Sequence, residues 1–307
     1  MIILNNIFPV FALIGLGAAL RHMHLTGEKF LKTSDRLVYY IFFPMLLFWK
    51  IGGSPSVDRG AVDLITAAIA AVATVYLISA ICLKLFRVSR FAAGSFSQSC
   101  YRFNTYVGMA VIMNVLGETG VSRFGILIGF IIPFINVLAV STLIWFAGRA
   151  ITIRERLRIT LRALVSNPLI IGCLAGMAYA RFIGVLPVFL NNTLRLAAMV
   201  TLPLALLSIG GTLTLKNIRE HFNPALLGCT IKLAILPWVG YAFLTAVSAS
   251  PLSVQVGMLF FSLPTSPAIV VLSSQLNSDT QFASTAIVLS TLLSFFSMSA
   301  VLLIFLH

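Results

Sequence analysis

The sequence predicts an all-α polytopic membrane protein: ten transmembrane helices in two inverted five-helix repeats, with helices 4 and 9 broken. Three observations lead to this prediction. First, 59% of the 307 residues are hydrophobic and 9% are charged, whereas a soluble chain carries roughly 25% charged residues. Second, ten apolar stretches follow one another, most of them long enough to cross a hydrocarbon core of about 30 Å. Third, basic residues concentrate in alternate connections between these stretches.

The ten helices are placed by the apolar stretches themselves. The first stretch has no Lys or Arg before it, so it lacks the basic start of a cleavable signal peptide and should remain as a helix. We expect the helices at residues 3–20, 35–51, 63–84, 91–116, 124–147, 164–182, 187–213, 223–249, 252–276 and 281–306.

Residues that recur 159 positions apart indicate an internal duplication. The matching pairs are Pro9 and Pro168, Gly17 and Gly176, Arg36 and Arg195, Pro44 and Pro203, and Gly52 and Gly211. Five crossings per copy force the second copy into the membrane upside down. We therefore divide the chain into a first five-helix repeat (1–148), a basic cytoplasmic connecting loop (149–162) and a second, inverted repeat (163–307). Inverted repeats are typical of secondary transporters, which bind substrate near the midplane where the repeats meet.

The distribution of basic residues predicts the orientation. The connections after helices 1, 3, 5 and 7 hold Arg21, Lys29, Lys32, Arg36, Lys84, Arg87, Arg90, Arg149, Arg154, Arg156, Arg158, Arg162, Lys216 and Arg219. The alternate connections hold few, so both termini should lie outside the cytoplasm in a multi-pass protein of the cytoplasmic (inner) membrane. The net charge of +13 thus follows the membrane and does not indicate nucleic-acid binding. The basic connection would anchor the topology and contact anionic lipid headgroups, with a regulatory partner as the alternative.

Two helices should be interrupted. Residues 95–108 are unusually polar for the middle of a membrane, and a shift of 159 moves 102–108 onto 261–267, which hold Pro264 and Pro267. Proline lacks an amide donor and clashes with the preceding turn. Ser266 would cap a new half-helix that begins at Pro267. Amide donors at such helix starts favour an anion; the alternative is a simple kink whose carbonyls bind Ser and Thr hydroxyls.

Two cations lie deep in predicted helices. Arg102 and Lys232 are each 10–12 residues from a helix start, whereas all eight acids lie in loops or at helix ends. A transported anion would supply the missing carboxylate. Alternatively, Arg102 binds carbonyls of the unwound segment and Lys232 is neutral when the site is empty. Without deep acids, uniport or proton coupling through substrate protonation is more plausible than a carboxylate relay.

Five short motifs resemble the auxin efflux carrier family, whose bacterial branch includes malate and malonate permeases. They are residues 43–48 with Gly52-Gly53, 102–108, 167–172, 202–211 and 263–267. The resemblance implies a fold similar to that of bile-acid sodium symporters, with helices 1, 2, 6 and 7 as a scaffold and helices 3–5 and 8–10 as a moving bundle. In that bundle, helices 4 and 9 would be broken and crossing at the midplane, beside the substrate. Asn104 matches the family residue that contacts a substrate carboxylate. No proline lies near Asn104, where relatives often have one, so that break rests on Asn104, Thr105 and Gly108.

We therefore expect an elevator-like carrier for a small organic anion, a dicarboxylate such as malonate or malate. The candidate substrate-binding residues are Arg102, Asn104, Thr105, Lys232, Ser262, Thr265 and Ser266, and the helix-break residues are Gly108, Pro264 and Pro267. We expect no cofactor or metal, since the four cysteines show no CxxC spacing, and the sequence leaves a homodimer open. Alternatives are a carrier for an amino-acid derivative, an auxin-like monocarboxylate or a neutral metabolite. A channel is a weaker alternative, because broken inverted repeats favour alternating access. An intramembrane enzyme is weaker still, because the four histidines lie at helix ends or in loops.

Overall fold

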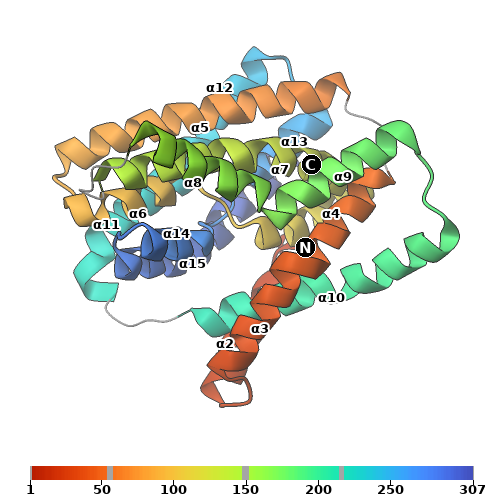
Figure 1. Ribbon diagram of the computed structural model, residues 1–307, viewed down its shortest axis with the longest axis horizontal. Coiled ribbons are helices and arrows are strands. Elements are labelled where there is room, and N and C mark those ends of the chain that lie inside the picture. Colours follow the sequence, from red (N-terminus) through yellow and green to blue (C-terminus); the bar gives the residue numbers. More distant parts are fainter. Residues whose placement is uncertain (1, 54–57, 147–151, 214–217, 307) are drawn as a thin grey trace. The chain divides into compact units, whose positions relative to one another are not determined.

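The computed structural model describes residues 2–53, 58–146, 152–213 and 218–306 (Figure 1). Within these ranges the chain is helical apart from short turns, and no strand occurs in them. The helices are α1 (Ile2–Asn6), α2 (Phe8–His22), α3 (Glu28–Leu37), the π-helix η1 (Val38–Phe42), α4 (Phe43–Gly52), α5 (Arg59–Leu85), α6 (Arg90–Tyr101), α7 (Thr105–Phe146), α8 (Ile153–Val165), α9 (Pro168–Phe182), α10 (Val188–Thr212), α11 (Ile218–Thr230), the π-helix η2 (Ile231–Ile235), α12 (Leu236–Ala246), α13 (Pro251–Phe261), α14 (Ala268–Gln275) and α15 (Thr280–Phe305).

Each expected span coincides with helical structure. Within the described ranges, five helical stretches are long and apolar enough to cross a membrane by length and composition: Arg59–Leu85, Arg90–Phe146, Val188–Thr212, Ile218–Ala246 and Thr280–Phe305. Shorter apolar helices cover Phe8–His22, Pro168–Phe182 and Pro251–Phe261. The longest stretch contains the expected helices 4 and 5, which are separated by a kink at Gly117 (φ 60°, ψ −152°). The composition of the chain and these helices fit a polytopic membrane protein.

The helices form two compact units that interleave along the sequence. Unit 1 contains Met1–Ile65, Thr105–Ile132 and Val165–Leu213, and unit 2 contains Thr66–Asn104, Pro133–Leu164 and Thr214–His307. Unit 1 thus holds expected helices 1, 2, 6 and 7, together with the last part of helix 4 and the first part of helix 5. Each unit draws on both halves of the sequence, so the division into repeats remains a separate prediction. The boundary at residues 148–149 lies outside the described ranges.

In unit 1, α2 packs on α10 and α4 packs on α9 (Figure 1). A glycine lies at each contact, where the Gly17 contact leaves no room for a Cβ and the Gly176 contact leaves little. A Cβ on Gly17 would lie 2.1 Å from the carbonyl oxygen of Leu207, and a Cβ on Gly176 would lie 3.1 Å from that of Phe48. Close backbone approach at small residues is a common way for membrane helices to associate. The two contacts are related by the same 159-residue shift, which moves Gly17 onto Gly176 and Phe48 onto Leu207.

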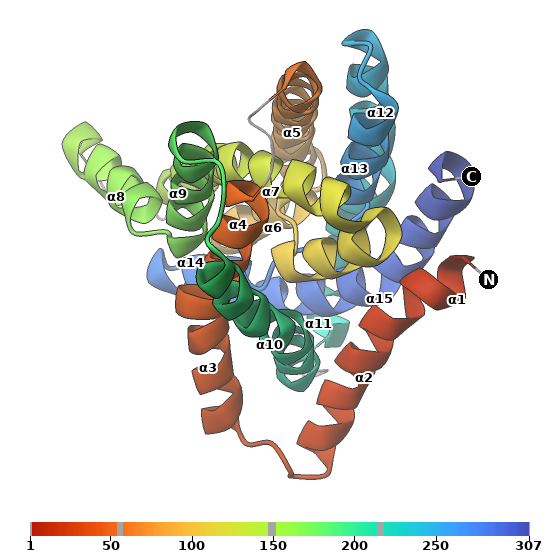
Figure 2. The same ribbon diagram turned by 90° about the vertical axis from the view of Figure 1, so that its right-hand side faces the viewer.

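In unit 2, α15 packs against α6, α11, α13 and α14, and α12 lies along α13 (Figure 2). Polar side chains of α6 form hydrogen bonds to other helices within this unit. The hydroxyl of Ser95 bonds that of Ser273 at 2.8 Å, and the hydroxyl of Ser97 bonds that of Ser79 at 2.9 Å. Hydroxyl pairs of this kind join helices in an apolar environment, where water cannot satisfy them.

Two prolines produce the π-helical turns. η1 ends two residues before Pro44, and η2 ends two residues before Pro237. Each proline removes one amide donor and clashes with the preceding turn, and a wider turn accommodates both effects.

Three predicted boundaries need correction. Much of the expected loop 149–162 is helical, because α8 starts at Ile153 and its apolar residues recur every four positions. Expected helix 6 starts at Pro168 instead of residue 164, because the Asn167 side chain accepts from the amide of Leu169 and ends the preceding helix. The half-helix α14 starts at Ala268, so Pro267 occupies the cap position that was expected for Ser266.

Candidate substrate site at two interrupted helices

Expected helices 4 and 9 are both interrupted, and the two interruptions meet in unit 2. α6 ends at Tyr101, and residues 102–104 are non-helical before α7 begins. α13 ends at Phe261, and six residues (262–267) separate it from the start of α14. The amide of Asn104 donates to the carbonyl of Pro264 at 2.8 Å. The structure therefore brings together the two breaks that the sequence places 159 residues apart.

Thr265 connects the second interruption to two other helices of unit 2. Its hydroxyl donates to the carbonyl of Ser99 in α6 at 3.1 Å, and its amide donates to the hydroxyl of Ser290 in α15 at 3.0 Å. Asn104 and Thr265 are 1% and 0% exposed. Non-helical backbone at this depth must find protein partners, and these bonds supply them.

Arg102 lies at the end of α6 with extended backbone (φ −68°, ψ 148°) and is 8% exposed. Its Nη1 donates to Oε1 of Gln98 at 3.1 Å, and its Nη2 donates to Oδ1 of Asn136 at 2.9 Å. Both acceptors are neutral amides. These two bonds fix the orientation of the guanidinium.

Lys232 is fully buried in η2 and reaches the other interrupted helix. Its Nζ donates to the carbonyl of Phe261 at 3.0 Å. Phe261 is the last residue of α13, where carbonyls have no intrahelical partner and the helix dipole is negative. The contact thus stabilises the end of the first half of expected helix 9.

The remaining predicted site residues make local contacts or belong to unit 1. The Ser262 hydroxyl donates to the Leu259 carbonyl at 2.9 Å, and the Ser266 hydroxyl accepts from the Ala268 amide at 3.3 Å. Thr105 is half-buried at the start of α7, and Gly108 is buried one turn later. Both belong to unit 1.

Four partners were missed by the sequence analysis: Gln98, Ser99, Asn136 and Ser290. Gln98 and Ser99 lie in the polar stretch that was recognised as a whole. Asn136 has a polar side chain inside the apolar stretch 124–147. A polar side chain in a membrane helix needs a polar partner, and this need was the signal that could have linked Asn136 to Arg102. Ser290 gave no such signal, because Ser recurs throughout the last helix. Across the described ranges, no group of three or more His, Cys, Asp or Glu residues could hold a metal ion.

Comparison with known proteins identifies the family. A family model described as membrane transport protein matches residues 2–302. The chain belongs to this family, that of the auxin efflux carriers. The resemblance drawn from the five motifs is thereby confirmed, and this family member is a multi-pass membrane transport protein. It is similar to a protein of Rhizobium meliloti (strain 1021) that is provisionally described as a malonate transporter. The two are 27% identical over 299 residues, which cover 94% of this chain and 91% of the relative.

Proposed function

We propose that this family member is a secondary carrier for a small organic anion, a dicarboxylate such as malonate or malate. One observation carries the proposal: two interrupted helices from opposite halves of the chain meet at the Asn104–Pro264 hydrogen bond, two residues from a buried arginine. Interrupted helices in corresponding halves of a transporter are the best pointer to its substrate site.

The chemistry of the site favours an anion. Arg102 donates to the neutral oxygens of Gln98 and Asn136, and we propose that its guanidinium also binds a substrate carboxylate, which a guanidinium can do through two parallel hydrogen bonds. Asn104 would donate to the same carboxylate group. Thr265, Ser266, Ser262 and Thr105 border the interruptions, while Lys232 supports the end of α13. Malonate is proposed because the R. meliloti relative is described as its transporter.

Alternating access by an elevator-like movement fits the division into two compact units. In this proposal unit 2 carries the substrate, because it contains Arg102, Asn104 and residues 262–267. The shared 159-residue shift of the Gly17–Leu207 and Gly176–Phe48 contacts supports two repeats of inverted topology. Uniport or coupling through substrate protonation remains our proposal for energetics. We also propose the cytoplasmic membrane, with both termini outside the cytoplasm.

Counterflow in proteoliposomes tests this function. Vesicles containing the purified protein are loaded with unlabelled malonate, malate, an amino acid or a neutral metabolite, and uptake of labelled malonate is followed. Trans-stimulation by dicarboxylates with saturable rates is expected. Trans-stimulation only by other solutes would identify a carrier of a different substrate. Flux that neither saturates nor shows counterflow would identify a channel and refute the proposal.

A further inference from the structure

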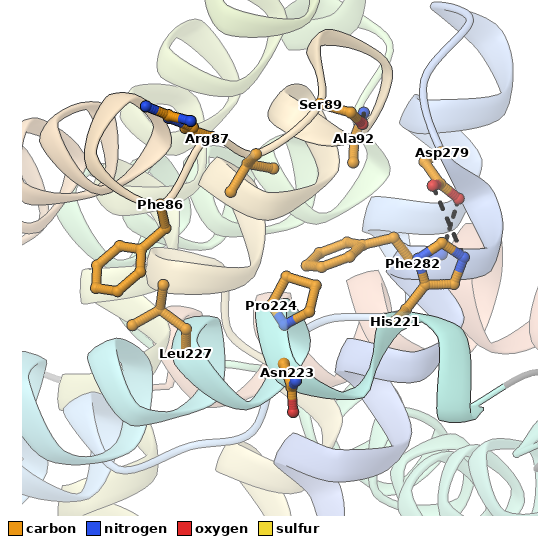
Figure 3. A pocket seen from close by; sticks show the side chains of 11 residues that line it. Phe86, Arg87, Ser89, Ala92, His221, Asn223, Pro224, Leu227, Asp279 and Phe282 are labelled. Atoms are coloured by element: carbon orange, nitrogen blue, oxygen red, sulfur yellow. Dashed lines mark hydrogen bonds and ion pairs between the residues drawn. The ribbon is translucent and has the colours of Figure 1, made fainter.

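A cavity of about 460 Å³ lies within unit 2, at the ends of α5, α6, α11 and α15 (Figure 3). Its lining is mostly apolar and includes Phe86, Val88, Pro224, Leu227 and Phe282. Phe86 itself is 57% exposed. The cavity lies away from the two interruptions: it borders the first residues of α6, whereas the interruption at Arg102 follows the last residue of α6.

Asp279, the acidic residue in the lining of this cavity, already has partners within the protein. Asp279 caps α15, accepting from the amides of Gln281 at 3.0 Å and Phe282 at 2.9 Å, and it lies 3.9 Å from Nε2 of His221. The close-up shows this pair at one end of the cavity and Arg87 with Phe86 at the other (Figure 3). The two ends of the cavity therefore differ in charge: the lining has its acidic residue, Asp279, at one end and Arg87 at the other.

Arg87 is an exposed cation in an unusual backbone conformation. Its φ of 50° lies in the left-handed region, which after a helix is normally occupied by Gly or Asn. The Val88 amide closes the end of α5 by donating to the Leu83 carbonyl at 3.2 Å. Among the described residues, the Arg87 side chain has no hydrogen bond or ion pair. A long cation at a position that favours Gly or Asn points to a role for its side chain.

The cavity has a defined place relative to the predicted membrane. Its lining comes from the connection after expected helix 3, the start of helix 8 and the start of helix 10. The positive-inside pattern places all three on the cytoplasmic side. At that level, an apolar cavity edged by a basic residue faces the headgroups and first acyl carbons of the inner leaflet. Basic pockets between helices on this side suit anionic headgroups.

We propose that this cavity binds one anionic phospholipid of the inner leaflet. Its phosphate would contact Arg87, and its glycerol and upper acyl chain would pack on Phe86, Pro224 and Leu227. The charge of Arg87 selects anionic lipids, and the apolar lining selects a lipid over a soluble anion.

Native mass spectrometry of the full-length protein in mild detergent tests this site with phosphatidylglycerol and phosphatidylcholine as probes. We expect one phosphatidylglycerol to bind more tightly than phosphatidylcholine. Arg87→Asn suits the left-handed position, so it should fold, and it should weaken phosphatidylglycerol binding about tenfold through loss of a charge-assisted contact. Arg90→Asn is the matched control, because Arg90 is also exposed and lies nearby but does not line the cavity.

A second variant tests the apolar part. Leu227→Trp keeps Arg87 and fills the cavity, so it should weaken binding of both lipids. Equal affinity for the two lipids in the unmodified protein, equal losses in the two arginine variants, or unchanged binding in Leu227→Trp would overturn the proposal. Displacement of phosphatidylglycerol by equimolar glycerol 3-phosphate would overturn it too, by revealing a site for soluble phosphate compounds.

Discussion

Replacing Arg102 by Gln is the most direct test of how the site binds an anion. Gln removes the charge but keeps an amide that can still donate to Gln98 or Asn136, which both accept from Arg102. The fold should therefore survive. A charge-assisted hydrogen bond contributes about 1.5–3 kcal/mol, and Arg102 is 8% exposed, so water compensates little of that loss.

Converted at about 1.4 kcal/mol per tenfold, this loss raises the apparent KM for malonate about 10- to 100-fold. Arg102→Lys should recover part of it, because Lys keeps the charge but lacks the planar fork. The assay is counterflow at a series of malonate concentrations, with the amount of folded protein measured by size-exclusion chromatography. Asn136→Ala is the control for orientation: it removes one neutral acceptor, worth about 1 kcal/mol, and should raise KM only a few-fold.

Two results would refute this reasoning. Near-normal counterflow by the Gln variant would mean that Arg102 does not bind substrate. A matched loss of folded protein in Arg102→Gln and Asn136→Ala, with unchanged KM in the protein that remains, would mean that Arg102 only joins α6 to α7.

Three further predictions follow from the packing and topology. Gly17→Ala should lower the thermal unfolding midpoint, because the new Cβ meets the Leu207 carbonyl. Gly15→Ala in the same helix is the control: its Cβ meets nothing within 4 Å, so it should be neutral or slightly stabilising. Equal effects of the two substitutions on the unfolding midpoint would contradict the packing. Thr265→Val should impair transport and Thr265→Ser should preserve it, because only the hydroxyl bonds to α6; a normal counterflow rate for Val would contradict this. A reporter fused at Glu155 should read cytoplasmic, and an external reading would overturn the predicted orientation.

Much of the fold could be predicted from composition and proline placement. Each apolar stretch coincides with helical structure, because a membrane requires both length and hydrophobicity. The ends differ by more in places, since helical residues begin at Glu28, seven residues before the expected start of helix 2. Pro264 and Pro267 predicted the break in expected helix 9, since proline cannot continue a helix ladder. No proline lies near Asn104. The break there was predicted because a shift of 159 residues moves 102–108 onto 261–267, which hold those two prolines.

The grouping of helices into units could not be derived from local patterns. It depends on contacts between residues far apart in sequence, such as α2 with α10. The family resemblance supplied a grouping by whole helices, but α7 changes unit between Ile132 and Pro133. That change occurs inside a continuous apolar stretch, so hydropathy carries no signal for it. The helix α8 was missed for a related reason. Its many arginines indicate a connection between membrane helices, whereas the four-residue spacing of its apolar residues indicates a helix.

Arg102 and Lys232 show why a site needs contacts as well as composition. Arg102 and Lys232 look alike in sequence, since each is a basic residue deep in an apolar stretch. Lys232 donates to the last carbonyl of α13, where the negative helix end compensates much of its charge. Arg102 donates to the neutral side-chain amides of Gln98 and Asn136, next to the interruption of expected helix 4. Because we propose that Arg102 binds the anion and that Lys232 supports the end of α13, we expect Lys232→Met to lower stability more than substrate affinity while Arg102→Gln does the reverse.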